Sequence, residues 1–278
     1  MILKDKNAVI YGASASIGGA FAKAFAEAGA NVFVTHYRLE TAQKVADEII
    51  RNGGKAEAAA VDALDQDAIE TFLKSVIDKV GSIDISFNAI GIKDVQDIPL
   101  IEMTVEDFQQ PINIAMKTQF LTGTAAARYM SQQNSGVILS LTATPGGIGY
   151  ANVGGFGPAC NAIEGFSRNL AAEVGSSGVR VVNIRSGGSP DSRPFKEAIA
   201  AGGDEVKEFI DKMANDTMLK QMPMMADIAN TGVFLASSLA SKITGVTIDV
   251  TVGTTTALNY KATNVAFLKK DNKEADNL

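Results

Sequence analysis

Short runs of apolar residues alternate along the chain with longer stretches in which apolar residues recur every three or four positions. The short runs predict buried strands and the longer stretches predict amphipathic helices. The expected strands are Asn7–Tyr11, Asn31–Thr35, Ala56–Val61, Ile83–Phe87, Val137–Leu141, Val179–Ile184 and Val246–Val250. The expected helices are 17–28, 39–51, 65–80, 108–132, 156–174 and 226–239. This alternation predicts a parallel, doubly wound α/β sheet with helices on both faces.

The pattern also predicts the domain organisation. Residues 1–258 carry every expected strand and helix, so we expect a single Rossmann-like domain. Residues 189–224 are polar, methionine-rich and helical in parts, as expected of a mobile lid over a substrate. Residues 259–278 are charged and polar, and we expect them to form a solvated tail.

Composition and charge narrow the possible partners. Hydrophobic residues make up 46% of the chain and the mean hydropathy is +0.09, as in a globular protein. A net charge of -6 and a pI near 5.0 argue against a nucleic-acid partner. No apolar run approaches the length of a membrane span. Cys160 is the single cysteine, and the first residues show no signal-peptide pattern, so we expect a cytoplasmic location.

A small-residue loop follows the first expected strand. It reads Tyr11-Gly12-Ala13-Ser14-Ala15-Ser16-Ile17-Gly18-Gly19 and leads into a helix. Glycines in such a loop let backbone N–H groups approach a pyrophosphate, and the helix N-terminus presents partial positive charge to it. The loop alone is weak evidence, because small residues also serve simple strand–helix packing.

From about Leu3 to Thr254 the chain resembles the short-chain dehydrogenase/reductase family. The TGxxxGxG loop of that family corresponds to Tyr11–Gly18, with Ser16 in place of its middle glycine. Further motifs are matched by Asp62-Ala63, by Phe87–Gly91, by Ser186-Gly187 and by the closing stretch Thr244–Gly253. The resemblance implies a dinucleotide site at Gly12, Ser14, Ser16, Ile17, Gly18, Asp62, Ala63, Asn88, Gly91 and Gly187.

The end of the second strand bears on which nicotinamide cofactor fits. An acidic residue there would bind a ribose diol and repel a 2′-phosphate, but this chain has Thr35-His36-Tyr37-Arg38. The sequence therefore favours NADP(H) over NAD(H), with His36 and Arg38 near the phosphate. The alternative is that these two residues belong to a solvated loop. Ser16 lowers the expected affinity, since its side chain lies where the backbone should approach the pyrophosphate.

The four catalytic positions of the family hold other residues here. The resemblance places the family's Asn at Ala115, its Ser at Ala143, its Tyr at Phe156 and its Lys at Cys160. Phenylalanine cannot donate a proton, and cysteine is too short to replace the lysine. Since a positioned general acid contributes roughly 10²–10⁴ in rate, we expect no ordinary alcohol–ketone catalysis by the family mechanism.

Three residues are possible replacements. Tyr150 follows the fifth strand, where family members line the substrate pocket, and is a candidate proton donor without a neighbouring lysine in sequence. Thr142, with Thr144 beside it, is a candidate for orienting a carbonyl, although such residues more often only pack. Cys160 near a helix N-terminus is either an activated thiolate or, more often, a small buried hydrophobe.

These observations favour a divergent NAD(P)(H)-dependent oxidoreductase with an atypical active site that reduces an activated small molecule. A non-catalytic dinucleotide-binding protein, acting as a sensor or an inactive partner subunit, is the alternative, and a lyase or isomerase is a third. Fold alone does not choose among them. The resemblance also implies a homodimer or homotetramer paired through the two long helices. We expect no metal site.

Overall fold

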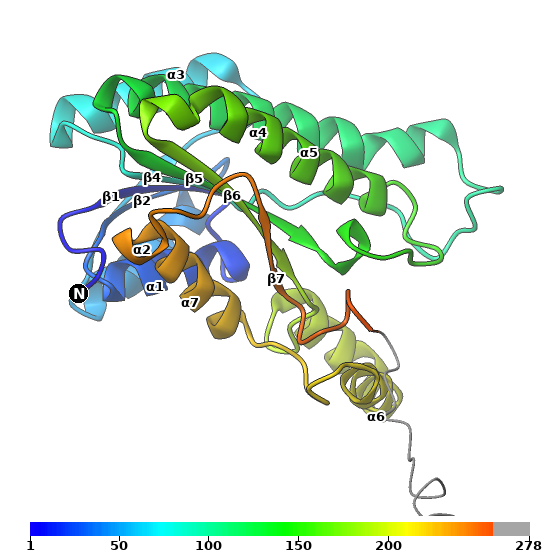
Figure 1. The fold of residues 1–278 in the computed structure, drawn as a ribbon. Coiled ribbons are helices and arrows are strands. Elements are labelled where there is room, and N and C mark those ends of the chain that lie inside the picture. Colours follow the sequence, from blue (N-terminus) through cyan, green and yellow to red (C-terminus); the bar gives the residue numbers. More distant parts are fainter. Residues whose placement is uncertain (258–278) are drawn as a thin grey trace, which may run out of the picture.

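A computed structural model describes residues 1–257, and Figure 1 shows a sheet between two layers of helices. The strands are β1 (Asn7–Tyr11), β2 (Asn31–His36), β3 (Lys55–Ala60), β4 (Ile85–Asn88), β5 (Gly136–Ala143), β6 (Val179–Ser186) and β7 (Thr247–Val250). The helices are α1 (Ile17–Glu27), α2 (Leu39–Arg51), α3 (Gln66–Val80), α4 (Val105–Gln133), α5 (Phe156–Val174), α6 (Arg193–Asp216) and α7 (Met225–Ala236). Short 3₁₀ turns are η1 (Thr144–Gly146), η2 (Gly175–Ser177) and η3 (Ser238–Ala240). The expected tail, 259–278, lies outside the described residues.

The sheet is parallel in every pairing, and its strand order is β3-β2-β1-β4-β5-β6-β7. The order reverses between β1 and β4, where Tyr11 pairs with Asn88 at the carboxyl ends of the two strands. Open α/β sheets bind ligands at such a switch point. The doubly wound, Rossmann-like fold expected from the sequence is confirmed.

Two helical layers bury the two faces of the sheet. Helices α1, α2 and α7 pack on one face and α3, α4 and α5 on the other (Figure 1). Alternate residues of β1 pack against the two helical layers, because successive side chains of a strand point to opposite faces. Ala8 and Ile10 join the first core, while Val9 and Tyr11 join the second.

Capping residues explain where several helices begin and end. Asp65 caps α3 by accepting hydrogen bonds from the N–H groups of Asp67 and Ala68, and Gly81 ends that helix with a φ of 80°. Thr104 caps α4 by accepting from the N–H of Asp107, so this helix begins at Val105, one turn earlier than its apolar pattern predicts. Such caps contribute typically about 1 kcal/mol each.

The segment expected to be a lid is largely helical. Helix α6 lies apart from the two main layers, at the end of the molecule where β7 finishes (Figure 1). Its path breaks at Gly203, which has a φ of 56° and a ψ of -129°. Within residues 1–257 no helix has the length and apolar character needed to cross a bilayer.

Candidate active site

The loop between β1 and α1 forms a tight backbone cradle at the switch point. Gly12 has a φ of +77°, and a Cβ there would lie 2.7 Å from the carbonyl oxygen of Ala89. A Cβ on Gly18 would lie 2.6 Å from the carbonyl oxygen of Gly12. No side chain caps the N-terminus of α1. Its N–H groups are therefore available to an anion, so the cradle fits the pyrophosphate of a dinucleotide.

Ser16 stands at the N-cap of α1, next to Ser14 and Ile17. Its φ of -131° and ψ of -150° lie in the extended region that any residue adopts. The serine therefore replaces the family's glycine without backbone strain. Ser14, Ser16 and Ile17 are all partly exposed, as residues that contact a ligand at this helix end would be.

His36 and Arg38 lie together at the carboxyl end of β2. The N–H of Arg38 donates to Nδ1 of His36 (3.0 Å). The Arg38 guanidinium lies 5.0 Å from the centroid of the Tyr37 ring, which in turn stacks on the imidazole. Burial, together with the charge of Arg38 and a smaller effect of Arg193, lowers the pKa of His36. At neutral pH the imidazole is thus neutral and Arg38 carries the positive charge.

The other expected cofactor residues lie along the same edge of the sheet. Asp62 is exposed and its carboxylate accepts from the N–H of Leu64 (2.9 Å), whereas Ala63 is buried. Asn88 is buried; its amide donates to Thr122 (2.9 Å) and accepts from the N–H of Ile90 (3.0 Å). Asn88 therefore fixes the loop after β4 rather than presenting its amide to solvent. Gly91 is exposed beyond it.

The positions that the sequence assigns to the family's catalytic residues lie around the end of β5. Ala143 ends that strand, and Phe156 is the first residue of α5. Ala115 of α4 packs against Ala159 and Ile163 of α5 in a small apolar cluster. The side chains at these positions are apolar.

Cys160 lies beneath η1. It is 1% exposed, and a Cβ on Gly146 would lie 3.1 Å from its Cβ. Burial raises the pKa of the Cys160 thiol to about 11, although a backbone hydrogen bond with Ala143 acts in the opposite direction. This environment fits a small buried hydrophobe and not an activated thiolate.

We predict that Cys160 resists alkylation in the folded protein. With a pKa of about 11, roughly a thousandth of the thiol is ionised at pH 8, against about a quarter for a free cysteine. Iodoacetamide should label Cys160 only in denaturant or well above pH 9, as measured by the mass of the intact chain. Complete labelling of the native protein within minutes at pH 7.5 would contradict this environment.

Thr142 is part of a buried polar network and does not line the cavity. Its hydroxyl donates to Oε1 of Glu164 (2.9 Å) and accepts from the amide of Asn183 (2.8 Å). The residue is 4% exposed. The hypothesis that Thr142 orients a substrate carbonyl does not agree with this position, because its hydroxyl is buried and already bonded on both sides.

Glu164 and Arg185 form the centre of that network. The guanidinium donates to the two carboxylate oxygens of Glu164 at 3.0 and 2.6 Å. It also donates to Asp249 (3.2 Å) and to the carbonyl oxygen of Gly146 (3.3 Å). Burial lowers the pKa of Arg185, but Glu164 and Asp249 outweigh burial and raise it overall. Arg185 of β6 is thus hydrogen-bonded to residues of α5, η1 and β7.

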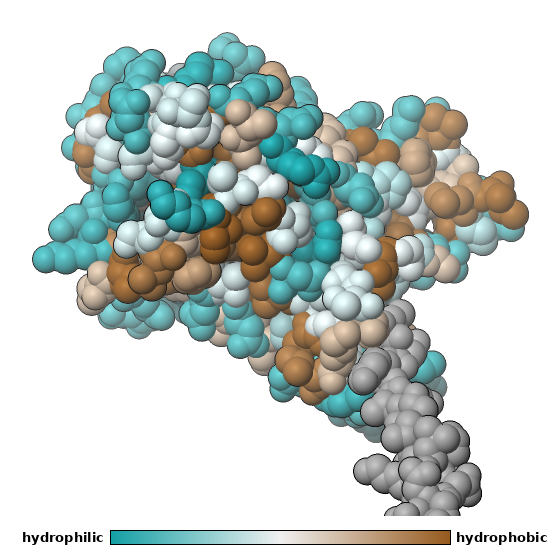
Figure 2. Space-filling model, viewed as in Figure 1, coloured by the Kyte–Doolittle hydropathy of each residue, from teal (hydrophilic) through white to brown (hydrophobic). Residues whose placement is uncertain are grey.

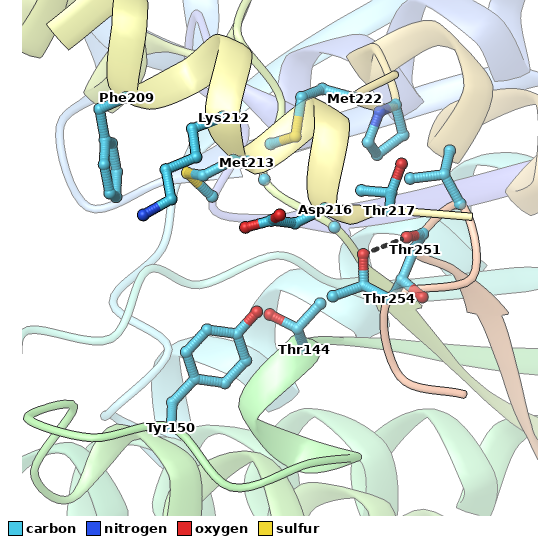
Figure 3. A pocket seen from close by; sticks show the side chains of 14 residues that line it. Thr144, Tyr150, Phe209, Lys212, Met213, Asp216, Thr217, Met222, Thr251 and Thr254 are labelled. Atoms are coloured by element: carbon cyan, nitrogen blue, oxygen red, sulfur yellow. Dashed lines mark hydrogen bonds between the residues drawn. The ribbon is translucent and has the colours of Figure 1, made fainter. Parts of the chain in front are cut away.

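A cavity of about 230 Å³ opens beside this network. Figure 3 shows Tyr150 and Thr144 on one wall and the residues of α6 on the opposite wall. Its lining consists of Thr144, Tyr150, Gly187, Gly188, Phe209, Lys212, Met213, Asp216, Thr217, Met222, Pro223, Thr251, Val252 and Thr254. The Asp249 carboxylate accepts hydrogen bonds from Thr251 and Thr255, so the network ends in the turn that closes the cavity.

The structure brings together some expected residues and adds others. Tyr150, expected to line a substrate pocket, and Gly187, expected in the dinucleotide site, both line the cavity. Sequence reasoning missed Lys212 and Asp216 of α6. Their spacing of four residues indicated one helix face, but nothing in the sequence indicated which side of α6 faces the cavity.

Comparisons with known proteins agree with the fold. Residues 12–255 match the family model described as Enoyl-(Acyl carrier protein) reductase. A 3-oxoacyl-[acyl-carrier-protein] reductase of Synechocystis is 34% identical over 65% of this chain and 72% of its own. The reductase FabG of Staphylococcus aureus is 31% identical over 89% of this chain and 97% of its own.

Solved structures are similar as well. A short-chain type dehydrogenase/reductase from Mycobacterium marinum has a TM-score of 0.78 at 29% identity, covering 90% of this chain and 95% of its own. A 7α-hydroxysteroid dehydrogenase, complexed with NADH and 7-oxo glycochenodeoxycholic acid, has a TM-score of 0.79 at 27% identity, covering 93% and 96%.

Proposed function

Since this chain belongs to the short-chain dehydrogenase/reductase family, we propose that it is an NAD(P)(H)-dependent oxidoreductase that reduces an activated C=C or C=N bond in a small molecule. The family relationship supports an oxidoreductase. We further propose that the reaction does not use the family's mechanism. The reason is that alanine, phenylalanine and cysteine stand where the family has its catalytic groups.

The backbone cradle at the switch point is the observation that carries the proposal. Gly12 and Gly18 leave no room for a side chain, and the N-terminus of α1 has no side-chain cap. Gly187, which follows β6 on the same side of the sheet, lines the cavity beside η1. The cradle would hold the pyrophosphate, and the cavity would hold the substrate next to the nicotinamide.

The residues that line the cavity suit a reaction that depends little on general acid–base catalysis. When bound, the cofactor supplies a hydride. The chain contributes a cavity with apolar walls that excludes water, and the Tyr150 hydroxyl, which points into it (Figure 3), as the group that donates a proton. An activated C=C or C=N bond accepts hydride more readily than a simple ketone does. This difference offsets the absence of the family's Tyr and Lys.

NADP(H) is the proposed cofactor. Arg38 at the end of β2 carries a positive charge, and the structure shows no acidic side chain in hydrogen-bonding contact with it among residues 1–257. We expect this guanidinium to bind the 2′-phosphate of NADP(H). His36 lies beside it as a second ligand.

Titration of the purified protein with NADPH and with NADH, followed by nicotinamide fluorescence, tests the proposal. We expect NADPH to bind more tightly than NADH. We also expect turnover with at least one member of a panel of enones and imines, and little with simple ketones. If neither dinucleotide binds, the oxidoreductase proposal is wrong.

The role of Tyr150 has a separate test. Tyr150→Phe keeps the ring that lines the cavity and removes the hydroxyl, so we expect turnover of an active panel compound to fall by roughly 10²–10⁴. NADPH affinity should not change. An unchanged rate would remove Tyr150 from the mechanism and leave water as the proton source.

A non-catalytic dinucleotide-binding protein is the second candidate. The position of the family's lysine favours it, since Cys160 is buried beneath η1 and cannot reach a ribose. Tight NADPH binding without turnover across the whole panel would support this candidate over the first.

A further inference from the structure

One face of α6 forms a wall of the cavity. Phe209, Lys212, Met213 and Asp216 are spaced three and four residues apart and all line it. This spacing places them on one side of a helix. Figure 3 shows these side chains directed toward Tyr150 and Thr144 on the opposite wall.

Most of the cavity lining is apolar and adaptable. Met213 and Met222 contribute flexible thioether side chains, and Phe209, Pro223 and Val252 complete the apolar part. Methionine side chains fit ligands of varied shape. The cavity volume of about 230 Å³ lies below the roughly 300–1,000 Å³ typical of ligand pockets, so the ligand is small.

Lys212 is an exposed side chain with no ion-pair partner within residues 1–257. Elsewhere on α6, Lys207 pairs with Asp204 at 2.9 Å and Arg193 with Glu197 at 3.6 Å. Within residues 1–257 no carboxylate lies within ion-pair distance of the Lys212 ammonium, although the side chain points into the cavity (Figure 3). An ammonium at the edge of an apolar cavity favours a ligand with a negative charge.

Lys212 is the cationic side chain among the lining residues, so the cavity matches a ligand with one anionic group. Asp216 lies one helical turn beyond Lys212, about 6 Å farther along the axis, and its carboxylate also faces the cavity. The anion would be held at the Lys212 end, with the uncharged part of the ligand extending past Met213.

We propose that the cavity binds a small conjugated carbonyl compound with an apolar body and one carboxylate, and that Lys212 binds this carboxylate. The proposal rests on the proposed function, because it names the substrate class of the same site. The Tyr150 and Thr144 hydroxyls face the reactive part of the ligand from the other wall.

A matched pair of probes tests the charge preference. Cinnamate and cinnamamide share size and apolar body and differ in the carboxylate. Calorimetric titration of the full chain, first without cofactor and then with NADPH, should show cinnamate binding about ten-fold more tightly. Lys212→Met should abolish the preference and Lys212→Arg should keep it. Lys207→Met, on the same helix, is the control and should behave as wild type.

A second measurement locates the probe. With ¹³C-methyl methionine, cinnamate should shift the resonances of Met213 and Met222, assigned through leucine variants, and leave the fully buried Met130 unchanged. Equal affinities for the two probes, a preference that survives in Lys212→Met, no binding of either probe, or unshifted Met213 and Met222 would each overturn the inference. Failure of NADPH to bind would instead contradict the proposed function, since the probe preference is also measured without cofactor.

Discussion

Arg185→Met is expected to destabilise the protein by about 3–5 kcal/mol, because the variant leaves the Glu164 carboxylate buried without its partner. The side chains of Arg185 and Glu164 are 16% and 8% exposed, so water replaces little of the lost interaction. The variant also removes the hydrogen bonds to Asp249 and to the carbonyl of Gly146. Urea denaturation followed by circular dichroism measures the change in free energy of unfolding.

Two further variants separate burial from charge. In Arg185→Met/Glu164→Leu both charges are gone, so much of the lost stability should return, since apolar replacement of a buried pair is often near neutral. Arg128→Met is the surface control: Arg128 pairs with Glu70, but their side chains are 53% and 33% exposed. It should cost about 1 kcal/mol or less. A loss in Arg185→Met no larger than in this control would show that the network is screened by solvent.

The second large effect is expected at Arg38. Arg38→Ala should weaken NADPH binding by about 10–100-fold, the contribution of a charge-assisted hydrogen bond to a phosphate, and leave NADH binding unchanged. Arg51→Ala, at the last turn of α2 and so far from the end of β2, is the matched control. An equal loss for both dinucleotides would mean that Arg38 acts on the fold of the loop and does not recognise the 2′-phosphate.

His36 adds a pH dependence to the same site. Burial and the neighbouring Arg38 lower its pKa, so the imidazole is neutral in the free protein at pH 7–8. A bound 2′-phosphate favours the protonated form and raises this pKa, so binding takes up a proton. The preference for NADPH over NADH should therefore increase as the pH falls from 8 to 6. In His36→Gln this increase should be lost, leaving only the effect of the phosphate's own second ionisation, which has a pKa of about 6.

Much of the fold follows from local signals. The runs from Asn7–Tyr11 to Val246–Val250 each became a parallel strand, and the central ones are apolar because helices cover both of their faces. The observed start of a helix differs from the predicted start where a capping residue sets it, as Thr104 does for α4. The prediction that Thr142 orients a substrate carbonyl failed for another reason. The sequence shows a hydroxyl at a strand end, but its partners Glu164 and Asn183 come from other elements.

The sequence by itself determined the doubly wound sheet, the glycine cradle after β1 and the apolar residues at Ala143, Phe156 and Cys160, because periodicity, small residues and motif spacing are local properties of the chain. Only the tertiary structure decided that Arg185 closes a network with Glu164 and that Lys212 faces Tyr150 across a cavity. These pairs are distant in sequence, and their meeting depends on how β6 and α6 pack, which no local pattern encodes. The positive charge that the proposed substrate would meet comes from Lys212 of α6.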